Sequence, residues 1–210
     1  MSKSDKAERR AFMFDVRAEQ DERGSYIEGH PVVYGKEADI GGIFREEIVP
    51  GALDKTDLHD VCLLTNHDLN RIPLARSRNN NKNSTLQLTV DKEGLKIRAY
   101  LDTENNADAR ALYSAIERGD ITGMSFMFWI EEERWEDLGT DYPKRFIEKI
   151  STIVEVSAVT FPAYEDTSIM ARDKKALESA QRALESVREK SLESDELELW
   201  KEKVKLKGAF

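Results

Sequence analysis

A histidine, a serine and a glutamate in this chain stand where their side chains can together carry out acyl transfer. His67 follows an apolar run at the point where the chain turns polar, and catalytic side chains are often presented at the ends of strands. An imidazole has an ordinary pKa of about 6.5, so it can accept a proton near neutral pH. Ser125 lies in the least polar stretch of the chain, where an unpaired buried hydroxyl costs about 1–3 kcal/mol. A serine in that setting needs a hydrogen-bond partner or a catalytic role.

Glu155 supplies the carboxylate that this chemistry requires. In a β-strand, Glu155 and Ser157 share one face of an otherwise apolar segment, so the acid is expected to be paired or exposed. Paired with His67, it would orient the imidazole and stabilise the imidazolium that forms when Ser125 loses its proton. Each of the three also has a purely structural interpretation. These are an ordinary surface or capping histidine, a serine bonded to the neighbouring strand, and a glutamate on the solvent face.

Two other constellations compete with this one. Cys62 beside His67 would suggest a cysteine peptidase, but the apolar neighbours of Cys62 favour a thiol in the core. A metal site built from His59, His67 and Asp60 or Asp68 lacks a recognised ligand spacing such as His-Glu-x-x-His. The chain also has no glycine-rich phosphate loop, which disfavours nucleotide chemistry. We therefore expect no metal and no cofactor.

The composition limits the partners. The 210 residues suffice for one compact domain and an appendage, and 35% of them are charged, with a formal net charge of -9. Proteins that bind nucleic acid usually present a basic surface, so nucleic acid is not an expected partner. No apolar run approaches the ~18 residues of a membrane span, and residues 1–10 lack the apolar centre of a secretory signal. The single cysteine fits a reducing, cytoplasmic environment.

The elements that must hold these side chains are mostly strands. Residues 86–90 and 95–99 alternate apolar and polar around a short loop that ends in Gly94, which predicts a hairpin. An apolar stripe over residues 109–116 predicts a helix that Gly119 would end. Many short strands with one or two helices predict a mainly β (α+β) fold, a barrel or a sandwich with peripheral helices. Further strands are predicted over residues 11–16, 26–34, 121–130 and 146–161.

Three regions differ in composition. Residues 1–10 are polar and are expected to be flexible, and residues 11–172 hold the histidines, the prolines and most aromatic residues of a folded domain. Residues 173–210 are rich in Ala, Leu, Glu, Lys, Arg and Ser, which predicts a charged helical tail. The tail can dock on its own domain, bind a partner or a second copy, or be disordered. Its apolar residues at heptad spacing are Leu177, Ala180, Leu184 and Val187, then Leu197, Trp200 and Val204.

Five short segments follow one another in a specific order. They are residues 49–53 (Val-Pro-Gly-Ala-Leu), 64–68 (Leu-Thr-Asn-His-Asp), 93–95 (Glu-Gly-Leu), 119–126 (Gly-Asp-Ile-Thr-Gly-Met-Ser-Phe) and 154–164 (Val-Glu-Val-Ser-Ala-Val-Thr-Phe-Pro-Ala-Tyr). In this order the chain resembles the HK97-type prohead protease family of tailed phages, which is similar to the herpesvirus assembly proteases. The resemblance implies a β-barrel ringed by helices, with residues 11–172 as the protease domain.

The resemblance also implies roles for individual residues. His67 and Ser125 correspond to the catalytic pair of a serine endopeptidase, and Glu155 is the expected third member. Met127 departs from the family, which commonly has a small residue two places after the serine. A bulky side chain there is expected to narrow the pocket or to alter the neighbouring packing, without removing a catalytic group. The implied substrates are the major capsid protein or its scaffold extension and the protease itself, inside the assembling procapsid in the host cytoplasm. The tail would pack with scaffold or self-associate. The competing hypothesis is a catalytically silent assembly or scaffold protein with a protease fold.

Overall fold

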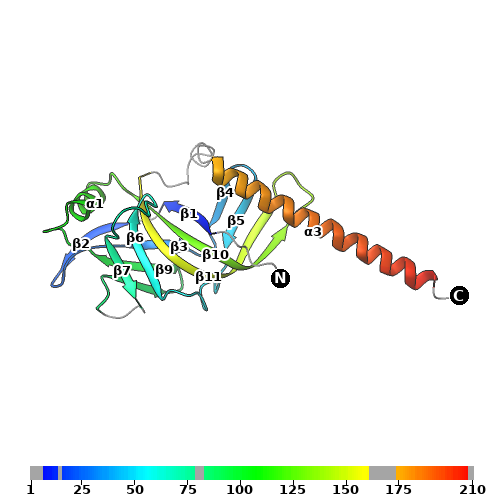
Figure 1. Ribbon diagram of the computed structural model, residues 1–210, viewed down its shortest axis with the longest axis horizontal. Helices are drawn as coiled ribbons and strands as arrows, with labels where there is room; N and C mark the ends of the chain where they lie inside the picture. The colour runs from blue at the N-terminus through cyan, green and yellow to red at the C-terminus, as the bar shows by residue number, and fades with distance from the viewer. Residues whose placement is uncertain (1–6, 14–15, 79–82, 161–173, 208–210) are drawn as a thin grey trace.

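The chain folds into a β-rich body from which one long helix projects (Figure 1). The computed structural model describes residues 7–13, 16–78, 83–160 and 174–207. Strands far outnumber helices in these residues, which confirms the mainly β class predicted from the sequence. The elements are β1 (Glu8–Met13), β2 (Arg17–Asp21), β3 (Gly24–Val33), β4 (Glu37–Ile40), β5 (Phe44–Ile48), β6 (Asp60–Thr65), β7 (Ala75–Arg78), β8 (Leu86–Val90), β9 (Gly94–Tyr100), α1 (Ala107–Glu117), β10 (Gly123–Glu136), β11 (Lys144–Val159) and α3 (Lys174–Lys207).

The strands form two sheets that share one hydrophobic core. The larger sheet runs β1-β10-β11-β5-β4, and β6 and β7 continue from β11; the smaller sheet runs β2-β3-β9-β8. Phe126 and Phe128 of β10 lie in the same buried cluster as Ile27 of β3 and Ile97 of β9. Because alternate residues of a strand point to opposite faces, these phenylalanines anchor β10 in the core and direct Ser125 to the other face.

The larger sheet does not close into the barrel that the family resemblance implied. β11 pairs in parallel with β5 through residues 144–147 and with β6 through residues 155–158. The ladder between β10 and β11 shifts register several times between Met127 and Glu133, and such bulges bend and twist long strands. The two halves of β11 therefore have different neighbours. The described strands form two sheets around a common core, which matches the predicted sandwich better than the barrel.

Several local predictions are confirmed. β8 and β9 form the predicted antiparallel hairpin. Gly94 has φ +146°, and a Cβ atom at this position would lie 2.0 Å from the carbonyl oxygen of Val32, so only glycine fits there. Helix α1 occupies the predicted segment, and the Asn106 side chain caps it by accepting hydrogen bonds from the backbone N–H groups of Asp108 and Ala109.

A buried ion cluster ties β1 to the rest of the larger sheet. We use this name for Glu8, Arg10, Glu46, Glu133 and Arg145. Arg10 donates to Glu46 Oε2 at 2.7 Å, and Arg145 donates to Glu46 Oε2 at 3.1 Å and to Glu8 Oε1 at 3.0 Å. These contacts hold β1 in place from Glu8 onward, within the segment expected to be flexible.

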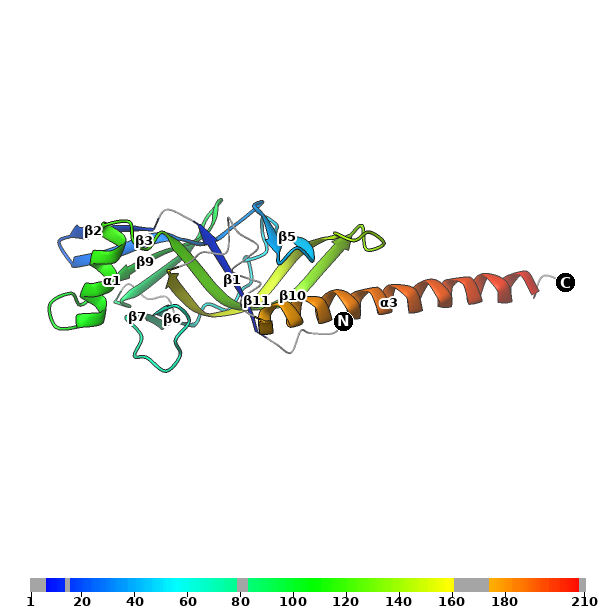
Figure 2. The ribbon, with the colours of Figure 1, turned by 90° about the horizontal axis from the view of Figure 1, so that it is seen from above.

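Helix α3 is bound to the body through its first turns only. Ala180 and Leu184 are buried against Ala38, Ile40 and Phe44, and the Arg188 guanidinium donates to the Leu138 and Thr140 carbonyls. The later turns extend away from the body in both views (Figures 1 and 2). The Leu177 and Val204 side chains, which belong to the predicted heptad pattern, lie outside the described part of the chain. In the described residues, no helix is long and apolar enough to cross a membrane.

Candidate active site

Three strands deliver the candidate catalytic side chains to one face of the larger sheet. Ser125 lies on β10 opposite Ser157 of β11, and Glu155 lies two residues earlier on β11, on the same face. β6 runs parallel to β11 and ends beside Ala158, and His67 follows two residues after that end. The chain order His, Ser, Glu therefore becomes a spatial cluster because β11 lies between β6 and β10.

The backbone turns sharply where β6 ends. Asn66 and His67 both have left-handed conformations, with φ of 52° and 58°. Asn and His are among the residues that tolerate this region best, although it carries a modest conformational cost. Hydrogen bonds hold the turn: Asn66 N donates to the Ala158 carbonyl at 3.0 Å, and Thr160 N donates to Asn66 Oδ1 at 3.0 Å. The result is an imidazole that points back over the sheet toward Ser125.

Both ring nitrogens of His67 have partners. Nε2 lies 2.6 Å from Ser125 Oγ, and Nδ1 lies 2.7 Å from Glu155 Oε2. An ionised carboxylate only accepts hydrogen bonds, so Nδ1 carries the proton and Nε2 is left to accept one. This is the tautomer that a general base for Ser125 needs. The geometry is that of a serine–histidine–carboxylate triad.

Ser157 makes hydrogen bonds to both Glu155 and His67. Its hydroxyl donates to Glu155 Oε1, and it accepts the backbone N–H of His67 at 3.0 Å. Glu155 is 1% exposed and Ser157 is fully buried. A buried carboxylate must be compensated, and here both of its oxygens accept hydrogen bonds. Strand alternation predicted that Ser157 shares a face with Glu155, but nothing in the sequence indicated its hydrogen bonds to Glu155 and His67.

Ser125 is shielded by β1 in this structure. Ala11 of β1 is its register partner, and only 1% of the serine is exposed. Ser125 Oγ lies 2.7 Å from the Arg10 carbonyl oxygen as well as 2.6 Å from His67 Nε2. A hydroxyl has one proton, so it can donate to the carbonyl or to the imidazole but not to both. The contact with the Arg10 carbonyl could not be found from the sequence. It depends on the register between β1 and β10, whose paired residues are more than a hundred positions apart and leave no local signal.

The rival constellations are not assembled. Burial raises the pKa of the Cys62 thiol, which disfavours the thiolate that a cysteine peptidase needs, and both nitrogens of His67 already contact other groups. The described residues contain no cluster of His, Cys, Asp and Glu suited to a metal ion. His30 Nε2 lies 3.1 Å from Asp91 Oδ2.

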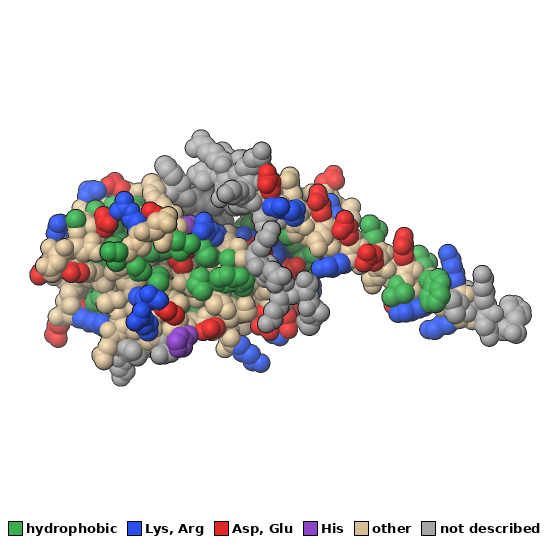
Figure 3. All heavy atoms as spheres, viewed as in Figure 1, with side chains coloured by type: hydrophobic (Ala, Val, Ile, Leu, Met, Phe, Trp, Pro, Cys, Tyr) green, Lys and Arg blue, Asp and Glu red, His purple; other side chains and the backbone are tan. Residues whose placement is uncertain are grey.

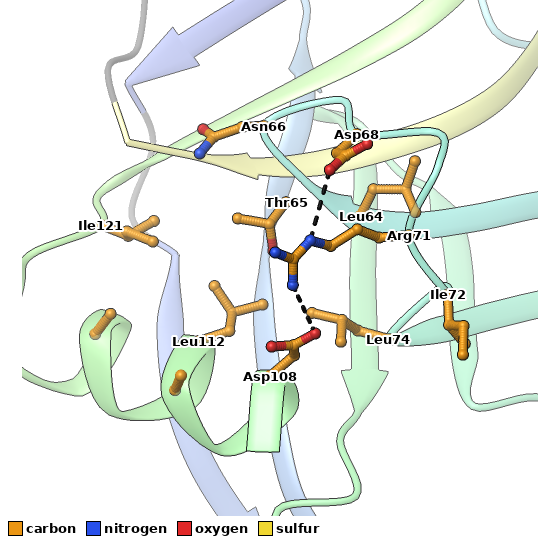
Figure 4. Close-up of a pocket in the computed structure, with 12 residues that line it drawn as sticks. Leu64, Thr65, Asn66, Asp68, Arg71, Ile72, Leu74, Asp108, Leu112 and Ile121 are labelled. Atoms are coloured by element: carbon orange, nitrogen blue, oxygen red, sulfur yellow. Dashed lines mark hydrogen bonds and ion pairs between the residues drawn. The ribbon is translucent and has the colours of Figure 1, made fainter. Parts of the chain in front are cut away.

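A cleft of about 470 Å³ opens beside the turn that carries His67 (Figure 4). Asn66 and Asp68, the two neighbours of His67, line it together with apolar side chains that include Leu112. The Arg71 side chain lies between Asp68 and Asp108 at the opening of the cleft (Figure 4). Its guanidinium donates a hydrogen bond to Asp108 at 2.9 Å and forms a longer ion pair with Asp68 at 3.5 Å.

The fold and the site together define a mainly β protein with the side-chain geometry of a serine hydrolase. A family model described as caudovirus prohead serine protease matches residues 12–182, so the chain belongs to that family. This confirms the resemblance seen in the sequence.

The chain is similar to individual phage proteases as well. The prohead protease of Enterobacteria phage HK97 is 26% identical over 160 residues, covering 75% of this chain and 64% of the relative. The chain thus spans less than two thirds of that relative's length. The solved structure of the bacteriophage T4 capsid assembly protease overlaps 74% of this chain and 99% of its own, with 15% identity and a TM-score of 0.39.

Proposed function

We propose that this chain is a serine endopeptidase of phage capsid maturation, with Ser125 as nucleophile, His67 as general base and Glu155 as the orienting acid. The observation that supports this best is the His67 imidazole, whose two nitrogens lie 2.6 Å from Ser125 Oγ and 2.7 Å from Glu155. Three residues from three strands have no structural need to meet in this hydrogen-bonded order, whereas acyl transfer requires it.

The proposed reaction proceeds by acyl transfer. Ser125 Oγ attacks the scissile carbonyl carbon while its proton passes to His67 Nε2, and the imidazolium then protonates the leaving amine. Water, deprotonated by His67, hydrolyses the acyl-enzyme and restores the serine. Glu155 keeps the Nδ1 proton in place throughout and stabilises the positive charge on the ring. The serine hydroxyl must first turn from the Arg10 carbonyl to His67. Because Ser125 is 1% exposed and pairs with β1, we propose that β1 moves aside for a substrate to enter.

The proposed substrates are the major capsid protein or its scaffold extension, and the protease itself. Membership of the prohead protease family and the name of the HK97 relative support this choice. The reaction would take place inside the assembling procapsid in the host cytoplasm. In this proposal residues 11–172 form the protease domain, and residues 173–210 form a tail that packs with scaffold or associates with a second copy. The cleft beside His67 would receive an apolar substrate side chain.

A second candidate is a catalytically silent assembly protein that keeps the protease fold. One observation favours it, namely that Ser125 is 1% exposed and its hydroxyl can donate to the Arg10 carbonyl. In that case the three side chains would only stabilise the sheet.

The deciding experiment compares the wild-type chain with Ser125→Ala, each co-expressed with its cognate capsid protein and analysed by intact mass. We expect fragments of capsid protein or protease with the wild type and none with Ser125→Ala. Ser151→Ala is a matched control, because Ser151 on β11 only donates to the Trp129 carbonyl. Processing that persists in Ser125→Ala would show a different nucleophile. Capsids that assemble without any cleavage by the wild type would favour the silent protein.

A further inference from the structure

The projecting half of α3 carries apolar side chains that touch nothing in the body. Leu192 is 65% exposed, Leu197 51%, Leu199 55% and Trp200 62%. Figure 3 shows hydrophobic side chains gathered near the outer end of the helix, well away from the sheets. An isolated tryptophan on a surface needs no explanation, but four large apolar residues within nine positions of one projecting helix indicate a docking surface. We name residues 192–205 the outer segment.

The charges of the outer segment are divided along its length. Its first part carries only acidic charges, among them the exposed Glu193, Glu196 and Glu198, and its last part carries the exposed Lys201, Lys203 and Lys205 with a single acid, Glu202. Two such segments placed side by side in parallel would bring acid against acid and lysine against lysine. Placed antiparallel, each acidic part lies along the basic part of the other. The pattern is therefore complementary to itself in one orientation only.

Glu196 and Lys203 lie on the helix face of Leu192, Leu199 and Trp200, and neither has an oppositely charged residue three or four positions away. The positions three and four residues from Glu196 are Leu192, Glu193, Leu199 and Trp200, and Lys203 likewise has Leu199 and Trp200 on one side. Charged side chains on a helix find intrahelical partners at these spacings. Glu196 and Lys203 are seven residues apart, about two turns, so they share a face without reaching each other.

We infer that the outer segment binds the same segment of a second copy of this chain, in antiparallel orientation and with Leu199 and Trp200 at the two-fold axis. In this register Glu196 of each chain lies level with Lys203 of the other, and two-fold symmetry makes this ion pair twice. The two Trp200 rings and the flanking leucines form the apolar centre of the pair. This inference specifies the self-association proposed for the tail, and it does not depend on peptidase activity.

Sedimentation equilibrium of the full chain tests the inference directly. Ser125→Ala is used as the background so that self-processing cannot remove the tail. We expect a monomer–dimer equilibrium that Trp200→Ala weakens by about tenfold or more, as is usual for a central tryptophan. Glu196→Lys and Lys203→Glu each place like charges level and should weaken the dimer, whereas the double variant restores opposite charges and should recover it. Glu185→Lys, an exposed change nearer the body, is the matched control.

Cysteine cross-linking distinguishes the two orientations. In a Cys62→Ser background, Leu199→Cys lies at the two-fold axis and should form a disulfide between copies under mild oxidation. Leu192→Cys lies about 22 Å along the helix axis from its counterpart in the antiparallel pair, but directly beside it in a parallel one. Circular dichroism shows whether each variant keeps its helix. A monomeric parent chain, a dimer unaffected by Trp200→Ala, failure of the double charge variant to recover, or cross-linking at position 192 alone would each overturn the inference.

Discussion

The ion cluster and the candidate active site are two buried polar clusters that both include residues of β10 and β11. They differ in whether every hydrogen-bond donor has its own acceptor. In the ion cluster, Arg10 and Arg145 are surrounded by Glu8, Glu46 and Glu133, and each guanidinium donates to more than one carboxylate. In the candidate active site, one serine proton lies between two acceptors, the Arg10 carbonyl and His67 Nε2. Arg10 belongs to both, through its side chain in one and its carbonyl in the other.

The difference separates a structural cluster from a reactive one. A cluster in which every donor has an acceptor has one favoured arrangement, and disturbing it costs stability. A serine hydroxyl that can turn to either of two acceptors can direct its proton to His67 Nε2, and transfer of that proton to the imidazole is the first step of acyl transfer. Changes in the ion cluster should therefore affect folding, and changes in the active site should affect rate. The following predictions test this division.

Of these changes, Glu155→Gln should have the largest effect, and it should lower the rate of cleavage without lowering the stability of the fold. A glutamine amide can donate to His67 Nδ1, which favours the tautomer with its proton on Nε2 and leaves no acceptor for the serine proton. By analogy with the same change in other serine peptidases, we expect cleavage to fall by about 10⁴-fold. Rates of capsid-protein cleavage measure this, with thermal unfolding as the companion. A large loss of thermal stability in this variant would contradict the division between the clusters.

Arg145→Met should instead lower the stability of the fold and leave the rate of cleavage nearly unchanged. Arg145 is 2% exposed and contacts three carboxylates, so its removal leaves buried negative charge uncompensated. We expect the free energy of unfolding to fall by about 3–5 kcal/mol. Urea denaturation measures it, and Arg134→Met is the control because the Arg134 ion pairs are exposed and worth about 1 kcal/mol at most. Cleavage per folded molecule should stay near the wild-type value.

Acid should weaken the ion cluster through Glu8. Burial alone would raise the pKa of this carboxyl, but Arg145 and Arg10 outweigh burial and hold the pKa at about 2, below its ordinary value of 4.5. A lowered folded pKa stabilises the fold fully above pH 4.5 and loses that contribution as the pH falls toward 2. The loss is on the order of 3 kcal/mol. Unfolding free energies measured between pH 6 and pH 2 should show a steeper decline for the wild type than for Glu8→Gln.

Ser157→Ala should have the smallest of these effects. The change removes the donor to Glu155 Oε1 and the acceptor of the His67 backbone N–H, both at buried positions. A lost buried hydrogen bond of this kind costs about 1–3 kcal/mol, which corresponds to a rate decrease of about 5- to 150-fold if it falls on the transition state. Ser157→Thr keeps the hydroxyl and should recover part of the rate. Equal rates for Ser157→Ala and wild type would remove Ser157 from the positioning role.

Much of the fold follows from local patterns. Alternation over residues 86–99 determined the β8–β9 hairpin, and the asparagine cap with its apolar stripe determined α1. These features depend on neighbours within a few positions, where propensity and periodicity act directly. The candidate residues His67, Ser125 and Glu155 were also chosen from the sequence, by residue type, local polarity and family resemblance.

Only the tertiary structure decided how these pieces meet. The pairing of β11 with β5 at one end and β6 at the other, which prevents a closed barrel, depends on contacts between distant segments. The same holds for the register of Ala11 with Ser125, which places the Arg10 carbonyl beside the hydroxyl of Ser125, the proposed nucleophile. Along the tail the same heptad spacing occurs on both sides of the interruption at Ser191 and Ser194, yet Ala180 and Leu184 are buried on the body while Trp200 is exposed. The periodicity shows which side chains share one face of the helix. The tertiary structure determines which surface, if any, that face contacts.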